Sequence, residues 1–189
     1  MARPLSEEKR DAILAAAATL VAAEGTGAPT ARIARAAGIS EGALFTYFAT
    51  KDALLNQLYL EIEAGLAGAM LDDYPWAGSA RDRMRHLWDR FLDWGAADPV
   101  RRRALKQLKV SERITAASKS QSEVSFRDIK AMLEQGLAGH VAPNQDMGFV
   151  RHAFGALAEM TLDYVADRPG EYEARKRAGF ELLWKGIAA

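Results

Sequence analysis

Apolar residues recur every three to four positions along almost the whole chain, and glycine and proline interrupt them. This spacing is typical of one face of an α-helix. The sequence has no strand-length run rich in Val, Ile and Thr, and it shows no repeat with a fixed period of 20–50 residues. The pattern therefore predicts an all-α protein with roughly nine helices.

Glycine, proline and capping residues set the expected helix ends. The predicted helices cover residues 6–25, 30–37, 41–48, 51–70, 79–97, 100–111, 126–139, 146–167 and 170–188. Residues 111–125 are rich in Ser and Thr and weakly periodic, so we expect a loop or a helix start there. Residues 140–145, which include Pro143, are expected to form a connector.

Composition excludes several classes of protein. The length of 189 residues fits one domain, or a small domain attached to a larger one. Lys plus Arg and Asp plus Glu both total 25, which excludes a histone-like protein that holds nucleic acid by bulk charge. Cysteine is absent, which excludes a disulfide scaffold, a thiol nucleophile and cysteine-ligated metal sites.

No targeting or membrane segment is recognisable. Residues 1–11 are highly charged and lack the apolar core of a signal peptide. The longest nearly apolar stretch, residues 12–23, has 12 residues and contains Thr19, whereas a spanning helix needs about 20. We therefore expect a soluble, cytoplasmic protein.

Residues 29–48 predict two short helices joined by a tight turn, which is a helix-turn-helix pattern. Ala34 is small enough for the two helices to cross closely, and Gly38 permits the positive φ that the turn needs. Leu44 and Phe48, four residues apart, are expected to pack the second helix inward.

The opposite face of the second helix is small and polar, as entry into a DNA major groove requires. It carries Glu41, Gly42, Ala43, Thr46 and Tyr47. A phenol hydroxyl and a first-turn ammonium, here Lys51, suit contacts with phosphate. The same short pattern also occurs as ordinary packing in helical proteins, and these side chains then serve core or solvated roles.

The run TARIARAAGISEGALFTYFATKDALL, residues 30–55, resembles the DNA-binding domain of TetR-family transcriptional regulators. The Ile-Ala core, the Ala-Gly-Ile-Ser turn, the Leu-Phe-x-Tyr-Phe stretch and the Lys-Asp-x-Leu-Leu opening match at the right spacing. The resemblance covers about residues 6–55; the remainder is similar only in length and helical character.

This resemblance implies a three-helix DNA-binding domain over residues 1–50 and a larger helical ligand-binding and dimerisation domain over residues 51–189. Members of the family are usually homodimeric repressors that a small-molecule effector releases from a palindromic operator. The DNA-binding residues that the resemblance implies are Thr30, Ser40, Glu41, Gly42, Ala43, Thr46, Tyr47 and Lys51. Thr30, Tyr47 and Lys51 would hold the DNA backbone, and Glu41, Gly42, Ala43 and Thr46 would face base edges.

Three positions depart from the family pattern. Phe45 stands where the family commonly has tyrosine, Glu41 often has a lysine counterpart, and Ala31 replaces a residue that is often polar. A carboxylate at position 41 cannot bind phosphate, but it can accept from cytosine or remain solvated. Base recognition is thus expected to be sparse and to depend on backbone contacts and DNA shape.

The later helices offer candidates for an apolar effector site and for a dimer interface. The expected ligand-binding residues are Met70, Trp88, Phe91, Trp94, Phe126 and Met132. The expected interface residues, on the last two helices, are Phe149, Ala153, Phe154, Leu157, Met160, Phe180, Leu183 and Trp184. Packing inside the subunit's own core is the alternative for both sets.

The sequence does not favour an enzyme, and we expect neither a cofactor nor a metal. No nucleotide-binding fingerprint is present, and His86, His140 and His152 lack metal-binding spacing along a helix. The alternative of another class is a helical homodimer that binds a small molecule or a protein and uses the helix-turn-helix only structurally.

Overall fold

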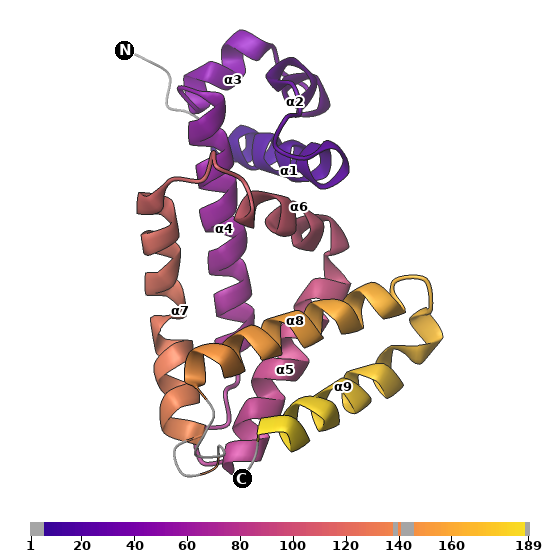
Figure 1. The fold of residues 1–189 in the computed structure, drawn as a ribbon. Helices are drawn as coiled ribbons and strands as arrows, with labels where there is room; N and C mark the ends of the chain where they lie inside the picture. The colour runs from indigo at the N-terminus through magenta and orange to yellow at the C-terminus, as the bar shows by residue number, and fades with distance from the viewer. Residues whose placement is uncertain (1–5, 138–139, 141–145, 188–189) are drawn as a thin grey trace. The chain divides into compact units, whose positions relative to one another are not determined.

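The computed structural model describes residues 6–137, 140 and 146–187, and every regular element in this part is helical (Figure 1). The α-helices are α1 Glu7–Glu24, α2 Thr30–Ala36, α3 Glu41–Tyr47, α4 Lys51–Leu71, α5 Ala80–Ala97, α6 Pro99–Lys109, α7 Ala116–Leu137, α8 Met147–Val165 and α9 Tyr172–Ile187. A 3-10 turn, η1 Pro169–Glu171, precedes α9. The all-α prediction is confirmed, and most boundaries lie within two residues of the predicted ones.

Polar side chains begin helices as the sequence suggests. Ser6, Ser40, Asp98 and Asp146 each accept a hydrogen bond from a backbone N–H in the first turn of α1, α3, α6 and α8. These bonds satisfy donors that the helix itself leaves free, and this fixes where each helix starts.

Helix α7 begins at Ala116, so of the two alternatives predicted for residues 111–125, a loop or a helix start, the structure shows a helix start. Thr115 caps the helix by accepting from the amide of Ser118 at 3.1 Å. Ser118 and Ser122 are buried, and the Ser122 hydroxyl donates to Glu63 of α4 at 2.8 Å. Serines thus occupy the inward positions that apolar residues normally mark, which explains the weak periodicity.

The first compact unit of the chain is Met1–Gly65 with Asp98–Ser125, of which residues 1–5 lie outside the described part. Within it, α1, α2 and α3 gather at the N-terminal end of α4, and α6 packs along α1 (Figure 1). Its core contains Ile13, Leu14, Ile33, Leu44, Leu54 and Leu55, each at most 1% exposed.

The second compact unit is Leu66–Ala97 with Phe126–Ala189, of which residues 138–139, 141–145 and 188–189 are not described. Helices α5, α8 and α9 pack against one another in it. Trp88 of α5 is fully buried, makes an edge contact with the Phe154 ring of α8, and donates its indole N–H to the Lys176 carbonyl of α9 at 2.8 Å.

The predicted functional boundary at residue 50 and the packing units divide the chain differently, because α6 and the start of α7 pack with the N-terminal helices. The functional boundary stays a prediction. Most of the predicted connector, residues 141–145, and the predicted helix end near residue 139 lie outside the described residues. Within the described part, no helix is both long and apolar enough to cross a membrane.

Candidate nucleic-acid interface

Helices α2 and α3 and the turn between them form the helix-turn-helix that the sequence predicts. Ile33 and Ala34 of α2 and Leu44 of α3 are at most 1% exposed, so the two helices pack on one apolar face. Gly38 has a φ of 71°, a backbone conformation that favours glycine. The amide of Ile39 donates to the Ala34 carbonyl at 3.0 Å and closes the turn. Local sequence therefore determines this geometry.

The outer face of α3 is open to solvent. Glu41, Gly42 and Thr46 are exposed, whereas Ala43 and Tyr47 are half-buried. A Cβ added at Gly42 would meet no atom within 4 Å, so the space beside this position is open. Such a face can approach base edges closely. That it contacts DNA stays a prediction.

The hydroxyl groups of this region differ in what they can still donate. Ser40 and Tyr47 accept hydrogen bonds, Ser40 from the Ala43 amide at 3.2 Å and Tyr47 from the Ser6 amide at 3.3 Å. Each oxygen uses a lone pair in this bond, so its own proton remains available for a phosphate. The Thr46 hydroxyl instead donates to the Gly42 carbonyl at 3.3 Å.

Thr30 and Glu41, which the resemblance places on phosphate and on a base edge, contact each other. The Thr30 hydroxyl donates to Oε1 of Glu41 at 2.5 Å. Thr30 is the first residue of α2 and Glu41 the first of α3, so the bond joins the starts of the two motif helices. Spacing along the sequence does not predict this pair, because its members are 11 positions apart and only the crossing of the two helices brings them together.

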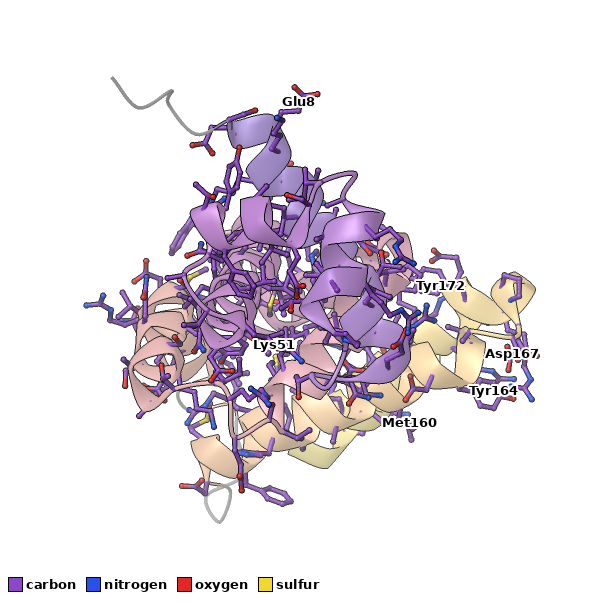
Figure 2. All side chains as sticks on the ribbon, turned by 90° about the horizontal axis from the view of Figure 1, so that it is seen from above. Glu8, Lys51, Met160, Tyr164, Asp167 and Tyr172 are labelled. Carbon is purple, nitrogen blue, oxygen red and sulfur yellow. The ribbon has the colours of Figure 1, made fainter. Side chains whose placement is uncertain are left out.

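Lys51 begins α4 immediately after the helix-turn-helix (Figure 2). Partial burial lowers its pKa from the usual lysine value; Arg113 lowers the pKa further, and Asp52 partly opposes this. Arg113, in the connection between α6 and α7, is anchored by an ion pair with Asp52 at 2.7 Å. Arg113 adds a cation that the sequence does not predict, because it lies 62 positions after Lys51 and no local motif marks it.

The predicted effector residues are partly brought together in the second unit. Phe91 of α5 lies 6.5 Å from the Trp94 ring and 5.9 Å from the Phe154 ring, and Phe154 also contacts Trp88. Phe91 and Trp94 are half-buried, but Trp88 is fully buried and hydrogen bonded. Core packing therefore accounts for Trp88.

The other three effector candidates lie on α4 and α7. Met70 and Met132 are buried, and Phe126 is half-buried. Their role in binding stays a prediction.

The predicted dimer residues fall into two groups. Phe149 and Met160 are 64% and 50% exposed, and Ala153 and Leu157 are half-buried. In contrast, Phe154, Phe180 and Leu183 are at most 8% exposed and belong to the core of their own unit. Trp184 is half-buried and stacks on Phe180 with ring centroids 6.2 Å apart.

An open apolar groove, here called the α8–α9 groove, runs over the exposed side of these two helices. Phe149, Ala153, Ala156, Leu157, Met160, Leu182, Leu183, Gly186 and Ile187 line it. Met160 is seen on α8 in Figure 2, where Tyr164 continues the same face. Leu182, which is 65% exposed, was not predicted from the sequence, because apolar residues lie on two sides of α9 and spacing alone does not identify the outer side.

Comparisons with known proteins agree with this geometry. Residues 13–58 match the family model described as bacterial regulatory proteins, tetR family. The structure is similar to that of a TetR-family regulator from Shewanella sp. PV-4, with a TM-score of 0.84 and 26% identity over 96% of this chain and 98% of that one.

Two similar structures hold ligands. FadR from Bacillus subtilis in complex with stearoyl-CoA has a TM-score of 0.73 and 18% identity over 94% of this chain and 98% of that one. LfrR from Mycobacterium smegmatis in complex with proflavine has a TM-score of 0.71 and 20% identity over 97% of this chain and 99% of that one. At these identities, both similarities show a shared fold and nothing about the ligand of this chain.

Proposed function

We propose that the chain is a member of the TetR family of transcriptional regulators and that it acts as a homodimeric repressor, which a small effector releases from an inverted-repeat operator. It acts in the cytoplasm by binding, without catalysing a reaction. The observation that carries the proposal is the exposed outer face of α3, flanked by Tyr47 and Lys51, within the helix-turn-helix that matches the family.

The DNA contacts divide into two kinds. Tyr47, Ser40 and Lys51 hold phosphates, since two hydroxyl protons and an ammonium are available there. Gly42, Ala43 and Thr46 face base edges on the outer face of α3. A dimer presents two copies of this face to two half-sites, which predicts an operator with two-fold symmetry.

The effector that we propose is a small, mainly apolar molecule. The half-buried rings of Phe91, Trp94 and Phe126 offer apolar contact surface in the second unit, and the ligands of two similar regulators carry a long acyl chain or an aromatic ring system. To release DNA, the effector must bind the arrangement that does not bind DNA more tightly than the one that does.

The dimer that we propose forms over the α8–α9 groove. Phe149, Met160 and Leu182 are half or more exposed there and form an apolar surface that a second copy can cover. The partly exposed small residues Ala153, Ala156 and Gly186 let helices approach closely. A two-fold axis through this surface would produce a four-helix bundle.

Selection of bound DNA from a random duplex library at about 0.1 M salt tests the function, because charge steering is partly screened at that concentration. We expect an inverted repeat. Lys51→Ala is expected to weaken binding to all sequences about ten-fold and to reduce the salt dependence by about one ion per subunit. Lys119→Ala, which removes an exposed lysine of α7 outside the motif, is the matched control and should change neither.

The competing function, a ligand- or protein-binding module with a purely structural helix-turn-helix, predicts a different outcome. Folded, dimeric protein would then enrich no sequence with or without a metabolite mixture. If wild type and Lys51→Ala bind DNA equally strongly, the assignment of Lys51 as a phosphate ligand is wrong.

A further inference from the structure

The hydrogen bond between Thr30 and Glu41 changes what each residue can do on DNA. At 2.5 Å it has the length of a charge-assisted O–H···O⁻ bond. A hydroxyl has one proton, so Thr30 cannot donate to Glu41 and to a phosphate at the same time. While this bond is present, the Thr30 hydroxyl is not a phosphate ligand.

The Glu41 carboxylate keeps one oxygen for another partner. Among the residues that the structure describes, Thr30 is its one hydrogen-bond or ion-pair partner, and it occupies Oε1. The second oxygen can accept from a donor outside the protein. The side chain is exposed at the start of α3 and neighbours Gly42, where the lack of a side chain and the open space let a base pair approach.

The chemistry of a carboxylate restricts what that donor is. Phosphates repel it, so a favourable contact on DNA must be with a base. The major groove offers two amino groups, N6 of adenine and N4 of cytosine. The adenine amino group stands between two acceptors, N7 and thymine O4, whereas the cytosine amino group has an acceptor on one side only. A carboxylate therefore meets less repulsion at cytosine.

We propose, on the basis of the regulator function above, that Glu41 reads the amino group of one cytosine in each half-site, and that Thr30 is the positioning residue that orients the carboxylate. Holding Oε1 restricts the rotation of an otherwise free side chain and directs the second oxygen to the groove. Thr30 then acts on base preference at a single position, through Glu41, and not on general affinity for the DNA backbone.

The test is DNA selection with the full-length protein and four variants, Glu41→Gln, Thr30→Val, Thr30→Ser and Lys51→Ala. Glu41→Gln is expected to replace the cytosine preference by adenine at one position of each half-site, because an amide both donates and accepts. Thr30→Val should reduce the preference for cytosine at that same position by roughly ten-fold, and Thr30→Ser should retain it. Lys51→Ala should leave the base preferences unchanged.

Three results would overturn the proposal. If Thr30→Val weakens binding to all DNA sequences equally and lowers the salt dependence of binding, as Lys51→Ala does, then Thr30 is a phosphate ligand. An unchanged base preference in Glu41→Gln would remove Glu41 as a reader. Enrichment of no sequence by the wild-type protein would contradict the regulator function itself, and the wild-type selection distinguishes this from the first two. Circular dichroism of each variant checks that it is folded.

Discussion

Gly179 determines how closely helix α9 approaches α5 and α8. A Cβ at this position would lie 2.7 Å from Cζ2 of Trp88 and 2.9 Å from Oγ1 of Thr161. The Trp88 ring is fully buried, and its N–H is bonded to the Lys176 carbonyl of α9 itself. The ring therefore cannot move aside without losing that bond.

Gly179→Ala is expected to lower the free energy of unfolding by about 1–3 kcal/mol, because the added methyl group overpacks a full core. Urea unfolding at a fixed protein concentration measures this. Gly68→Ala is the matched control, since Gly68 is exposed in α4 and a Cβ there meets nothing within 4 Å. Helix propensity should make that variant more stable by about 0.8 kcal/mol. If Gly179→Ala is as stable as wild type, the Trp88 ring moves to make room for the added methyl group.

Residue-scale features that depend on near neighbours were predictable from the sequence. The Gly38 turn, the Ser40 cap and the buried pair Leu44 and Phe48 follow from spacings of at most four residues. The bond between Thr30 and Glu41 was not predictable, because it depends on the angle at which α2 crosses α3. Sequence reasoning assigned each residue to DNA separately and had no means to see that they meet.

Helix α4 carries a stripe of polar residues on the side that faces the connection between α6 and α7. Asp52, Asn56 and Glu63 follow one another at helical spacing and bind Arg113, Thr115 and Ser122. Glu63 is 4% exposed and also pairs with Lys109 at 2.8 Å. Hydrogen bonds and ion pairs, rather than apolar contact alone, therefore fix α4 against the end of α6, this connection and the start of α7.

Asn56→Ala is expected to lower the free energy of unfolding by about 1 kcal/mol, because Asn56 bonds two backbone groups of the connection. Its Oδ1 accepts from the Thr115 amide at 2.9 Å, and its Nδ2 donates to the Arg113 carbonyl at 2.8 Å. Hydrogen exchange gives the specific readout, since the Thr115 amide should exchange faster in the variant than in wild type.

Gln57→Ala is the control for this change, because Gln57 is the next residue of α4 and makes none of these bonds. It should leave Thr115 exchange unchanged. If Asn56→Ala also left it unchanged, the cap that Asn56 provides would not restrain the connection.

At the scale of elements, apolar periodicity predicted helices wherever apolar residues face inward. Its signal was too weak at residues 116–125 to decide between a loop and a helix start, because Ser118 and Ser122 face inward there. Their hydrogen-bond partners, Thr115 and Glu63, satisfy the buried hydroxyl groups. A polar contact between helices leaves no mark in the pattern of apolar residues. For the same reason, the polar stripe of α4 could not be predicted from that pattern.

At the scale of the whole molecule, charge cannot provide DNA affinity by itself, since basic and acidic residues are equal in number. The affinity for DNA must therefore come from a small number of specific contacts, and a dimer doubles their number. The sequence predicted the last two helices as the interface, but it could not identify their outer side. Phe154 and Phe180 are buried in the core of their own unit, whereas the exposed Leu182 lines the groove.

Leu182→Glu is therefore expected to dissociate the dimer that we propose. Two-fold symmetry places the change twice in one interface, so the loss is about twice the 2 kcal/mol of one buried leucine, or roughly a thousand-fold in the dissociation constant. Sedimentation of the purified protein measures this constant. Arg177→Glu is the matched control, because it puts the same charge on an exposed position of α9, roughly 140° around the helix from Leu182. A Leu182→Glu protein that remains as tightly dimeric as Arg177→Glu would place the interface elsewhere. A monomeric variant that also loses half-site pairing in DNA selection would link this groove to operator symmetry.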